Sequence, residues 1–234
     1  AFFLRRGIEV MTDVRLKAIA DRLYTGRRLA DIGSDHAYLP IYAVSHGICP
    51  SAVATDVRKG PVASAHEHIE KAGLSDRIGV RLGDGLTVVD RSEAESGVIA
   101  GMGGELIAEL LANAPFAFDS DQQWLLQPMS HPEALRRFLL THGFSLVEDT
   151  VIPAGRRLYS LIQARYTAAP PVTDTAQYWI GAVSPRGCDR YWERLTDYLA
   201  QCCRGAALRG ESAEAVAQWA EWETRVRAYW QEGK

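Results

Sequence analysis

Several features that mark other classes of protein are scarce or missing in this sequence of 234 residues. No stretch approaches the roughly 20 consecutive apolar residues that a membrane-spanning helix needs, and residues 1–10 are too short and too charged for a secretory signal. Positive charge is not in excess, because the formal net charge is -3, so a globally basic nucleic-acid binder is excluded while a local basic patch is not. We therefore expect a cytoplasmic protein with no membrane partner, and Met11 as a native start.

Cysteine is also sparse, and its four residues lack the spacing of a metal site. Cys49, Cys188, Cys202 and Cys203 form no Cys-x-x-Cys or His/Cys pattern, so we expect reduced thiols and no bound metal. No internal repeat or low-complexity tract is present. The remaining composition, 47% hydrophobic and 24% charged, is that of a globular protein long enough for one domain and an appendage.

The stretch from Leu29 to Pro40 reads as a short apolar strand that ends in a turn and opens a helix. Gly33 marks the turn, and the helix start would aim free N–H groups at a ligand. The Gly-x-Gly-x-x-Gly pattern of dinucleotide folds is absent. Instead Asp31 and Asp35 flank the glycine, and two carboxylates suit a cationic, hydroxyl-rich ligand such as S-adenosylmethionine better than a pyrophosphate.

Five apolar runs, at residues 29–32, 51–56, 78–82, 97–100 and 124–129, alternate with helical segments and predict a parallel sheet. Residues 144–152 and 157–166 predict a hairpin that adds an antiparallel strand near one edge. The ends of the five runs carry Asp31, Asp56, Asp84, Gly101 and Gln127. Because open α/β sheets bind ligands at the carboxyl ends of their strands, these residues predict one shared site.

Each loop taken alone keeps a second interpretation. Asp56 lies about 25 residues beyond Asp31, near the spacing of a ribose-binding carboxylate. Asp84, between Gly83 and Gly85, is either an adenine-amine acceptor or an ordinary turn residue. The glycines of residues 101–104 either let two substrates meet or only allow close packing. His36 either contacts a ligand or fixes the turn, and we read His66 and His68 as surface residues.

After residue 168 the composition shifts to a linker followed by two helical segments, at about 188–204 and 211–229. The spacing of four and three predicts that the helices pack through two series of residues: Tyr191, Leu195, Tyr198 and Cys202, and Ala215, Trp219, Trp222, Val226 and Tyr229. Packing between the helices is the better interpretation of these aromatics, although exposed ones suit base stacking. We expect two units, residues 12–167 and 168–234, with Thr12 or Asp13 capping the first helix.

The motifs together resemble the bacterial tRNA (adenine-22-N1)-methyltransferases of the TrmK type. The resemblance runs from about Asp13 to Tyr166 and is carried by residues 29–40, 60–61, 81–86, 99–104 and 126–128. It implies an α/β, Rossmann-like class I methyltransferase domain with a mixed seven-stranded sheet and a C-terminal coiled-coil hairpin. It further implies S-adenosyl-L-methionine as cofactor and methylation of adenine N1 in the D-arm region of tRNA.

The resemblance also implies roles for particular residues. Cofactor contacts fall on Asp31, Gly33, Ser34, Asp35, His36, Asp56, Val57, Gly83, Asp84, Gly85, Gly101 and Met102. The chemistry of the transfer, rather than the resemblance, leads us to place the target adenine at Gly103, Gly104, Pro128 and Met129. On the same grounds Asp35 or Gln127 would accept a hydrogen bond from the adenine amine, or Asp35 would offset the charge left on the product, and Tyr38 would stack on the base or hydrogen-bond to it.

The RNA itself needs positive charge from a net acidic protein. Arg27 and Arg28 are our first candidates for phosphate contact, followed by Arg15, Lys17, Arg22, Arg136, Arg137, Arg156 and Arg157. Two alternatives stay open: methylation of a small molecule or protein, and a non-enzymatic RNA-binding module with a vestigial cofactor site. The sequence does not fix the oligomeric state, for which we favour a monomer.

Overall fold

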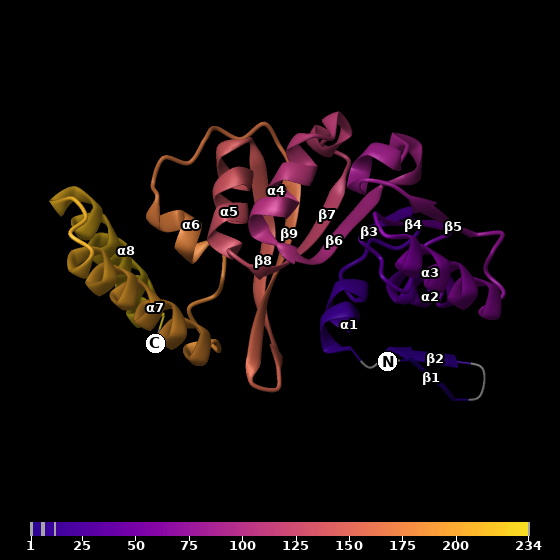
Figure 1. The fold of residues 1–234 in the computed structure, drawn as a ribbon, viewed down its shortest axis with the longest axis horizontal. Coiled ribbons are helices and arrows are strands. Elements are labelled where there is room, and N and C mark those ends of the chain that lie inside the picture. Colours follow the sequence, from indigo (N-terminus) through magenta and orange to yellow (C-terminus); the bar gives the residue numbers. More distant parts are fainter. Residues whose placement is uncertain (1, 6–7, 12, 234) are drawn as a thin grey trace.

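The structure, a computed structural model, describes residues 2–5, 8–11 and 13–233 and is built around one seven-stranded sheet (Figure 1). The strand order is β5-β4-β3-β6-β7-β9-β8. The strands are β3 (Leu29–Ile32), β4 (Ala52–Asp56), β5 (Ile78–Leu82), β6 (Ser96–Gly103), β7 (Gln123–Ser130), β8 (Phe144–Ala154) and β9 (Arg157–Tyr166). All neighbours pair in parallel except β9, which is antiparallel to both β7 and β8. The predicted mixed Rossmann-like sheet is confirmed.

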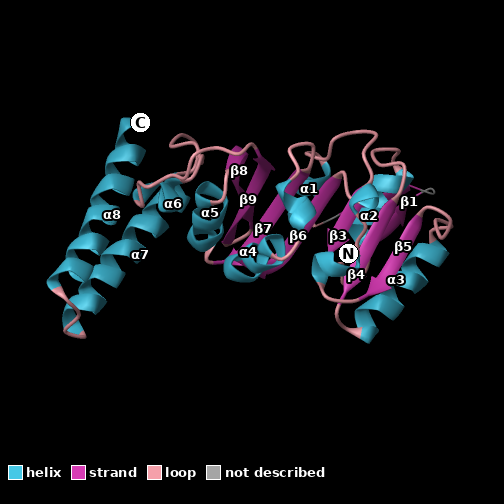
Figure 2. Ribbon diagram, turned by 90° about the horizontal axis from the view of Figure 1, so that it is seen from above, coloured by secondary structure: helices cyan, strands magenta, loops and turns pink. Residues whose placement is uncertain are grey.

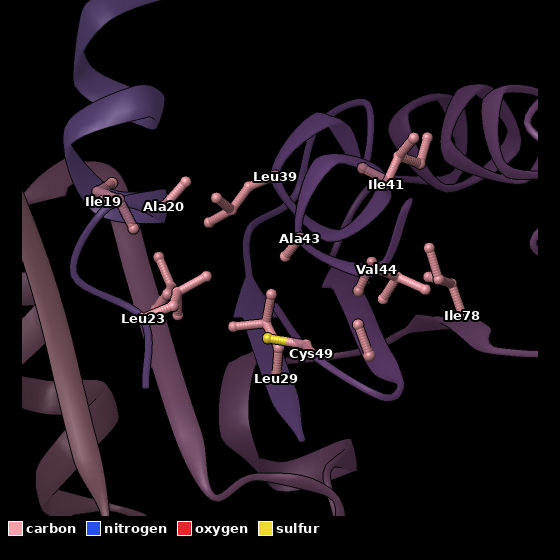
Figure 3. Packing of buried hydrophobic residues seen from close by; sticks show 14 of the residues in the cluster. Ile19, Ala20, Leu23, Leu29, Leu39, Ile41, Ala43, Val44, Cys49 and Ile78 are labelled. Atoms are coloured by element: carbon pink, nitrogen blue, oxygen red, sulfur yellow. The ribbon is translucent and has the colours of Figure 1, made fainter. Parts of the chain in front are cut away.

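Helices cover both faces of this sheet. One face carries α1 (Val14–Ala20), α2 (Tyr38–Ser45) and α3 (Lys59–Lys71), and the other carries α4 (Gly104–Ala112) and α5 (Pro132–Thr141). The alternation of strand side chains divides the core: Leu29 packs among Ile19, Leu39 and Ala43, as Figure 3 shows, whereas the next residue, Ala30, faces the opposite layer. Strands buried on both faces explain the continuous apolar runs in the sequence.

The chain reverses its direction of winding between β3 and β6, which lie side by side although β4 and β5 separate them in sequence. Such a switch point leaves a crevice beyond the carboxyl ends of the two strands. Three short 3₁₀ turns complete the connections: η1 (Gly85–Val88), η2 (Arg91–Glu93) and η3 (Pro115–Phe118).

Two predicted boundaries were wrong for identifiable reasons. We expected a loop at residues 101–104, but β6 continues to Gly103 because Gly101, with φ of +82°, makes a bulge that keeps Met102 paired with Pro128. We also ended the next-to-last strand at residue 152, but β8 includes Pro153. Proline is tolerated there because β8 is the edge strand of the sheet.

The C-terminal part contains α6 (Ala176–Ile180), which we did not predict, and the antiparallel pair α7 (Asp189–Leu208) and α8 (Ala213–Glu232). Figure 2 shows the pair side by side beyond the β8 edge of the sheet. The predicted packing series on α7 is right only in part: Tyr191 and Leu195 pack against the helical core, but Trp192 and Leu199 are fully buried and Tyr198 is 46% exposed. Trp192 and Leu199 lie in one buried cluster with Val226 and Trp230 of α8 and with Trp179 and Ile180 of α6.

A buried ion pair fastens this C-terminal part to the sheet. Arg136 of α5 donates to both carboxylate oxygens of Asp149 on β8, at 2.7 and 3.1 Å, and its third nitrogen donates to the Trp179 carbonyl at 3.1 Å. Arg136 is 1% exposed. It is therefore a structural residue, and our expectation that it contacts phosphate was wrong.

At the other end of the chain, β1 (Phe2–Arg5) and β2 (Ile8–Met11) form a separate antiparallel hairpin that we did not predict. Asp13 caps α1, because its carboxylate accepts from the Arg15 amide at 2.8 Å; Thr12, the other candidate cap, lies outside the described residues. No helix in the described ranges is long and apolar enough to cross a bilayer.

Candidate active site

A cavity of about 420 Å³ opens beyond the carboxyl ends of β3 and β6. Most of its wall comes from the turn after β3, and the start of α1 closes one side. The lining residues are Asp13, Arg15, Leu16, Asp31, Gly33, Ser34, Asp35, His36, Ala37, Tyr38, Leu39, Arg58, Ala100, Gly101 and Gln127. The predicted convergence on this edge of the sheet thus has a physical cavity at its centre.

Asp31 is a buried carboxylate with an unusual charge environment. Its residue is 7% exposed, and burial raises its pKa from 3.8 to about 6, against a smaller lowering by a hydrogen bond from the Ser34 hydroxyl. No arginine, lysine or histidine among the described residues pairs with it. A cationic ligand in the cavity would supply the missing partner and favour the ionised form.

The turn after Asp31 is held by its neighbours. Gly33 and Ser34 both donate their amides to the Thr55 carbonyl at 2.8 Å, so these two N–H groups, which precede the helix start, are held within the turn. Gly33 has φ of +75°, and a side chain there would overlap the end of the Met102 side chain. The turn therefore needs glycine, and it brings Met102 of β6 directly against the β3 turn.

Asp56 reaches the same rim but is already engaged. Its carboxylate accepts from the Arg58 amide at 2.9 Å and from Arg58 Nε at 3.2 Å, and the same guanidinium lies 3.5 Å from Asp35. The Arg58 side chain is 65% exposed and free to swing, whereas that of Asp56 is 5% exposed and fixed. A ribose hydroxyl could thus reach Asp56 by displacing Arg58. Val57, between them, is exposed.

Gly83, Asp84 and Gly85 lie beside Asp56 rather than in the wall of the cavity. The Gly83 amide donates to the Asp56 carbonyl at 3.0 Å, and the Thr55 hydroxyl donates to the Gly85 carbonyl at 3.5 Å. Asp84 is exposed at the start of η1. The loop that carries Asp84 is therefore at the predicted carboxyl ends of the strands, but it follows β5, one strand further from the cavity than Asp56 on β4.

His36 and Tyr38 belong to an aromatic cluster on one wall. The Tyr38 ring stacks on both His36 and His68, with centroids 5.1 and 5.2 Å apart, and His36 Nδ1 lies 2.8 Å from the Ser64 hydroxyl. His68, which we had assigned to the surface, is half-buried in this cluster. His36 also lies 3.3 Å from Asp35. Both its suggested roles remain compatible with this position, since it fixes the turn and lines the cavity.

The opposite wall is formed by β7 and α1. Gln127 is 2% exposed, and its amide nitrogen donates to the Pro128 carbonyl at 2.9 Å. Its amide oxygen accepts no hydrogen bond from the described residues. Beyond it, Pro128 is buried and Met129 is 43% exposed, with its sulfur 3.6 Å from Arg15. Among the described residues of the wall, Gln127 alone has a side-chain amide, and it is held in place with its oxygen available.

Gly103 and Gly104 differ in the space around them. Gly103 precedes α4 and has its Cβ position in ordinary contact with the Ser130 hydroxyl, at 3.4 Å. Gly104 is buried, and a Cβ there would overlap the His131 carbonyl. The structure therefore places Gly104 at a close packing contact between α4 and the end of β7, outside the cavity.

The predicted basic residues are not brought to the cavity as a group. Arg27 and Arg28 directly precede β3 and lie at the amino ends of the parallel strands. This is about 13 Å from the carboxyl end of the four-residue strand, where the cavity opens. Arg28 pairs with Glu95 at 3.0 Å, and Arg22 pairs with Glu148 at 2.6 Å. Of the candidates, Arg15 alone lines the cavity. Its guanidinium lies over the Tyr159 ring, 5.1 Å from the centroid.

Sequence reasoning missed Asp13, Leu16 and Arg58 as residues of the wall. The signal for Arg58 was available, because an Asp two residues before an Arg commonly caps its amide. Nothing in the sequence indicated that α1 folds over the cavity. No group of three or more metal-ligating side chains occurs within the described ranges.

Similarity to known proteins agrees with this geometry. A profile of the family described as "Methyltransferase domain" matches residues 12–162. The tRNA (adenine(22)-N(1))-methyltransferase of Bacillus subtilis is 37% identical over 156 residues, which are 67% of this chain and 66% of that protein, just under two thirds of its length.

Solved structures extend the likeness over nearly the whole chain. The crystal structure of the B. subtilis M1A22 tRNA methyltransferase TrmK has a TM-score of 0.81 at 27% identity, covering 96% of this chain and 98% of that one. A Streptococcus pneumoniae protein in complex with S-adenosyl-L-methionine has a TM-score of 0.79 at 27% identity, covering 92% and 99%. The chain therefore belongs to the methyltransferase-domain family, and within it its sequence and fold are similar to those of bacterial tRNA (adenine(22)-N(1))-methyltransferases.

Proposed function

We propose that this chain transfers the methyl group of S-adenosyl-L-methionine to N1 of adenine 22 in tRNA. The observation that carries the proposal is the buried Asp31 carboxylate, which faces a cavity of about 420 Å³ at the switch point of the sheet without a cationic partner. The cofactor, when bound, supplies a methyl group on a positively charged sulfur. Its ammonium and sulfonium groups match the charge that Asp31 lacks.

The residues around the cavity fit the rest of the cofactor. Asp56, once released by Arg58, would accept from the ribose hydroxyls, and Asp84 from the adenine amine of the cofactor. Gly33 and Met102 would bring the two central loops close enough to enclose the sulfur. The neighbouring contacts that we propose for the cofactor are Ser34, Asp35, His36, Val57, Gly83, Gly85 and Gly101.

The reaction is an in-line displacement in which adenine N1 forms a bond to the methyl carbon as the carbon–sulfur bond breaks. The protein mainly has to orient the two partners and exclude water. Gln127 would accept a hydrogen bond from the adenine N6 amine through its available oxygen, and Tyr38 would contact the ring. Asp35 would offset the positive charge left on the product. We propose that the base enters past Gly103, Pro128 and Met129.

N1 faces the partner base in a duplex, so the target adenine must be unpaired or flipped out to reach this cavity. We further propose a catalytic unit of residues 12–167, a C-terminal unit of residues 168–234, and a cytoplasmic location, where tRNA is available. The similar structure with bound cofactor supports the choice of ligand.

Transfer of labelled methyl from S-adenosyl-L-methionine to an unmodified tRNA transcript tests the proposal. We expect label in the transcript and none in one that carries guanine at position 22. A Gln127→Leu variant should keep its cofactor affinity and lose turnover, because it fills similar space without the acceptor. Equal labelling of the two transcripts would contradict the proposal.

A further inference from the structure

A second cavity, of about 350 Å³, lies between α5, the start of β9 and α7. Its lining combines aromatic and apolar side chains with polar and charged ones, among them Glu133 and the buried Arg136. The residues that matter for the inference are Ser130, His131, Leu158, Trp179, Arg194 and Tyr198. Its volume is in the range of sites that hold small organic groups.

The second cavity lies close to the proposed active site. Gln127 lines the first cavity and Ser130 lines the second, and both are on β7. Three residues of a strand span about 10 Å. Successive nucleotides of a stacked strand rise about 3.4 Å each, so a single RNA segment can reach both cavities with one to three nucleotides between them.

Arginines form a continuous border along the same side. Arg190 donates to the Gly155 and Arg157 carbonyls at 3.2 and 3.4 Å, and Arg194 donates to the Arg156 carbonyl at 3.1 Å. The four arginines Arg156, Arg157, Arg190 and Arg194 are exposed, and among the described residues none of them forms an ion pair with an acid. Their charge is therefore available to phosphate.

This arginine border also reaches the first cavity. Arg157 lies 3.4 Å from the Tyr159 hydroxyl, and Arg15 of the first cavity lies over the ring of that same tyrosine. In Figure 1 the β8–β9 hairpin projects below the sheet, between the α7–α8 pair on one side and α1 on the other. Positive charge thus follows the path from one cavity to the other.

We propose that the second cavity binds another extruded base of the RNA substrate, one to three nucleotides from the methylated adenine. The base stacks on Tyr198, whose ring is 46% exposed and is backed by Trp179 at a centroid distance of 6.1 Å. The adjacent phosphate binds Arg194, and Ser130 and His131 face the edge of the base. The inference rests on the proposed function and adds a binding site that makes the enzyme read the shape of the RNA around its target.

The affinity test compares Tyr198→Ala, Tyr198→Phe and a matched control, Leu208→Ala. Leu208 is 89% exposed on the same helix, about 15 Å further along. Stacking on one aromatic ring predicts about a tenfold weaker Kd for the tRNA transcript with Tyr198→Ala. Tyr198→Phe and Leu208→Ala should bind like the unchanged protein. Cofactor affinity and the rate at saturating tRNA should not change in any variant.

Ultraviolet cross-linking of the unchanged protein to the transcript supplies a readout that does not depend on a variant folding. We expect a nucleotide within three of position 22 to be joined to Tyr198 or Trp179. Three results would overturn the second site while leaving the proposed function intact. They are methyl transfer to tRNA with an unaltered Kd in Tyr198→Ala, equal losses of tRNA affinity in Tyr198→Ala and Tyr198→Phe, and cross-links only to other residues. If the unchanged protein transfers no methyl group to tRNA, both fail.

Discussion

Replacing Asp31 with asparagine should stabilise the ligand-free protein while removing its affinity for the cofactor. Burial raises the pKa of Asp31 from 3.8 to about 6. At about 1.36 kcal/mol per unit, the ionised carboxylate lowers the free energy of unfolding by about 3 kcal/mol at pH 8. The amide has nearly the same shape and no charge, so Asp31→Asn avoids that loss.

The effect depends on pH in a defined direction. Because the folded-state pKa is raised, the protonated carboxyl contributes its full stability below about pH 4, and that contribution is lost as the pH rises through about 6. The difference between Asp31→Asn and the unchanged protein should therefore be near zero at pH 4 and largest at pH 8. The cofactor affinity of the unchanged protein should increase as the pH rises through 6, because the ionised carboxylate binds the cationic cofactor.

Thermal unfolding with and without S-adenosyl-L-methionine measures both effects. For a chain of this size, about 3 kcal/mol corresponds to an increase in Tm on the order of 5–10 °C at pH 8. Added cofactor should raise the Tm of the unchanged protein and not that of Asp31→Asn. Asp84→Asn, at an exposed acid, is the control and should leave the ligand-free Tm unchanged. A lower Tm for Asp31→Asn at pH 8, or undiminished cofactor binding, would refute the reasoning.

Three further predictions concern packing and charge elsewhere. Gly104→Ala should destabilise the fold by about 2 kcal/mol, seen as a lower urea midpoint, because its Cβ meets the His131 backbone, which cannot yield cheaply; an unchanged midpoint would contradict this. Arg136→Met should cost about 3–5 kcal/mol in the same assay, since it leaves the buried Asp149 unpaired, and Asp149→Leu on that background should recover part of the loss. Arg157→Gln should reduce the salt dependence of tRNA binding by about one counterion, whereas Arg28→Gln, at the other edge of the sheet, should not; equal effects would contradict the assignment of phosphate contacts.

The arrangement of the sheet could be predicted because each strand carries its own signal. Apolar runs such as 29–32 and 78–82 are each followed by a glycine, Gly33 or Gly83, and the structure ends the strands just before it. The rules for parallel connections predict a parallel sheet from such alternating elements, whereas the strand order is known only from the structure. The acids Asp31, Asp56 and Asp84 could be assigned to one edge on the same grounds, since position in a parallel strand determines which edge a residue occupies.

What the sequence could not supply were contacts between distant segments. No local sequence pattern indicates that α1 lines the cavity, that Arg58 forms an ion pair with Asp56, or that His68 stacks on Tyr38. The charge of Arg136 suggested a surface residue, but its partner Asp149 is 13 residues away on another element and both are buried. The buried face of α7 likewise depends on distant residues, because Trp192 and Leu199 lie in one cluster with Val226 and Trp230 of α8.

The identity of the methylated nucleoside tests the central claim most directly. A tRNA transcript incubated with the protein and S-adenosyl-L-methionine would be digested to nucleosides, separated and identified by mass spectrometry, with the position mapped by the stop that N1 methylation imposes on reverse transcription. The proposed function predicts 1-methyladenosine at position 22 alone. Methylation of the N6 amine, of another position, or of no base at all would contradict the assignment of Asp31 and Gln127 to a site that joins the cofactor to adenine N1.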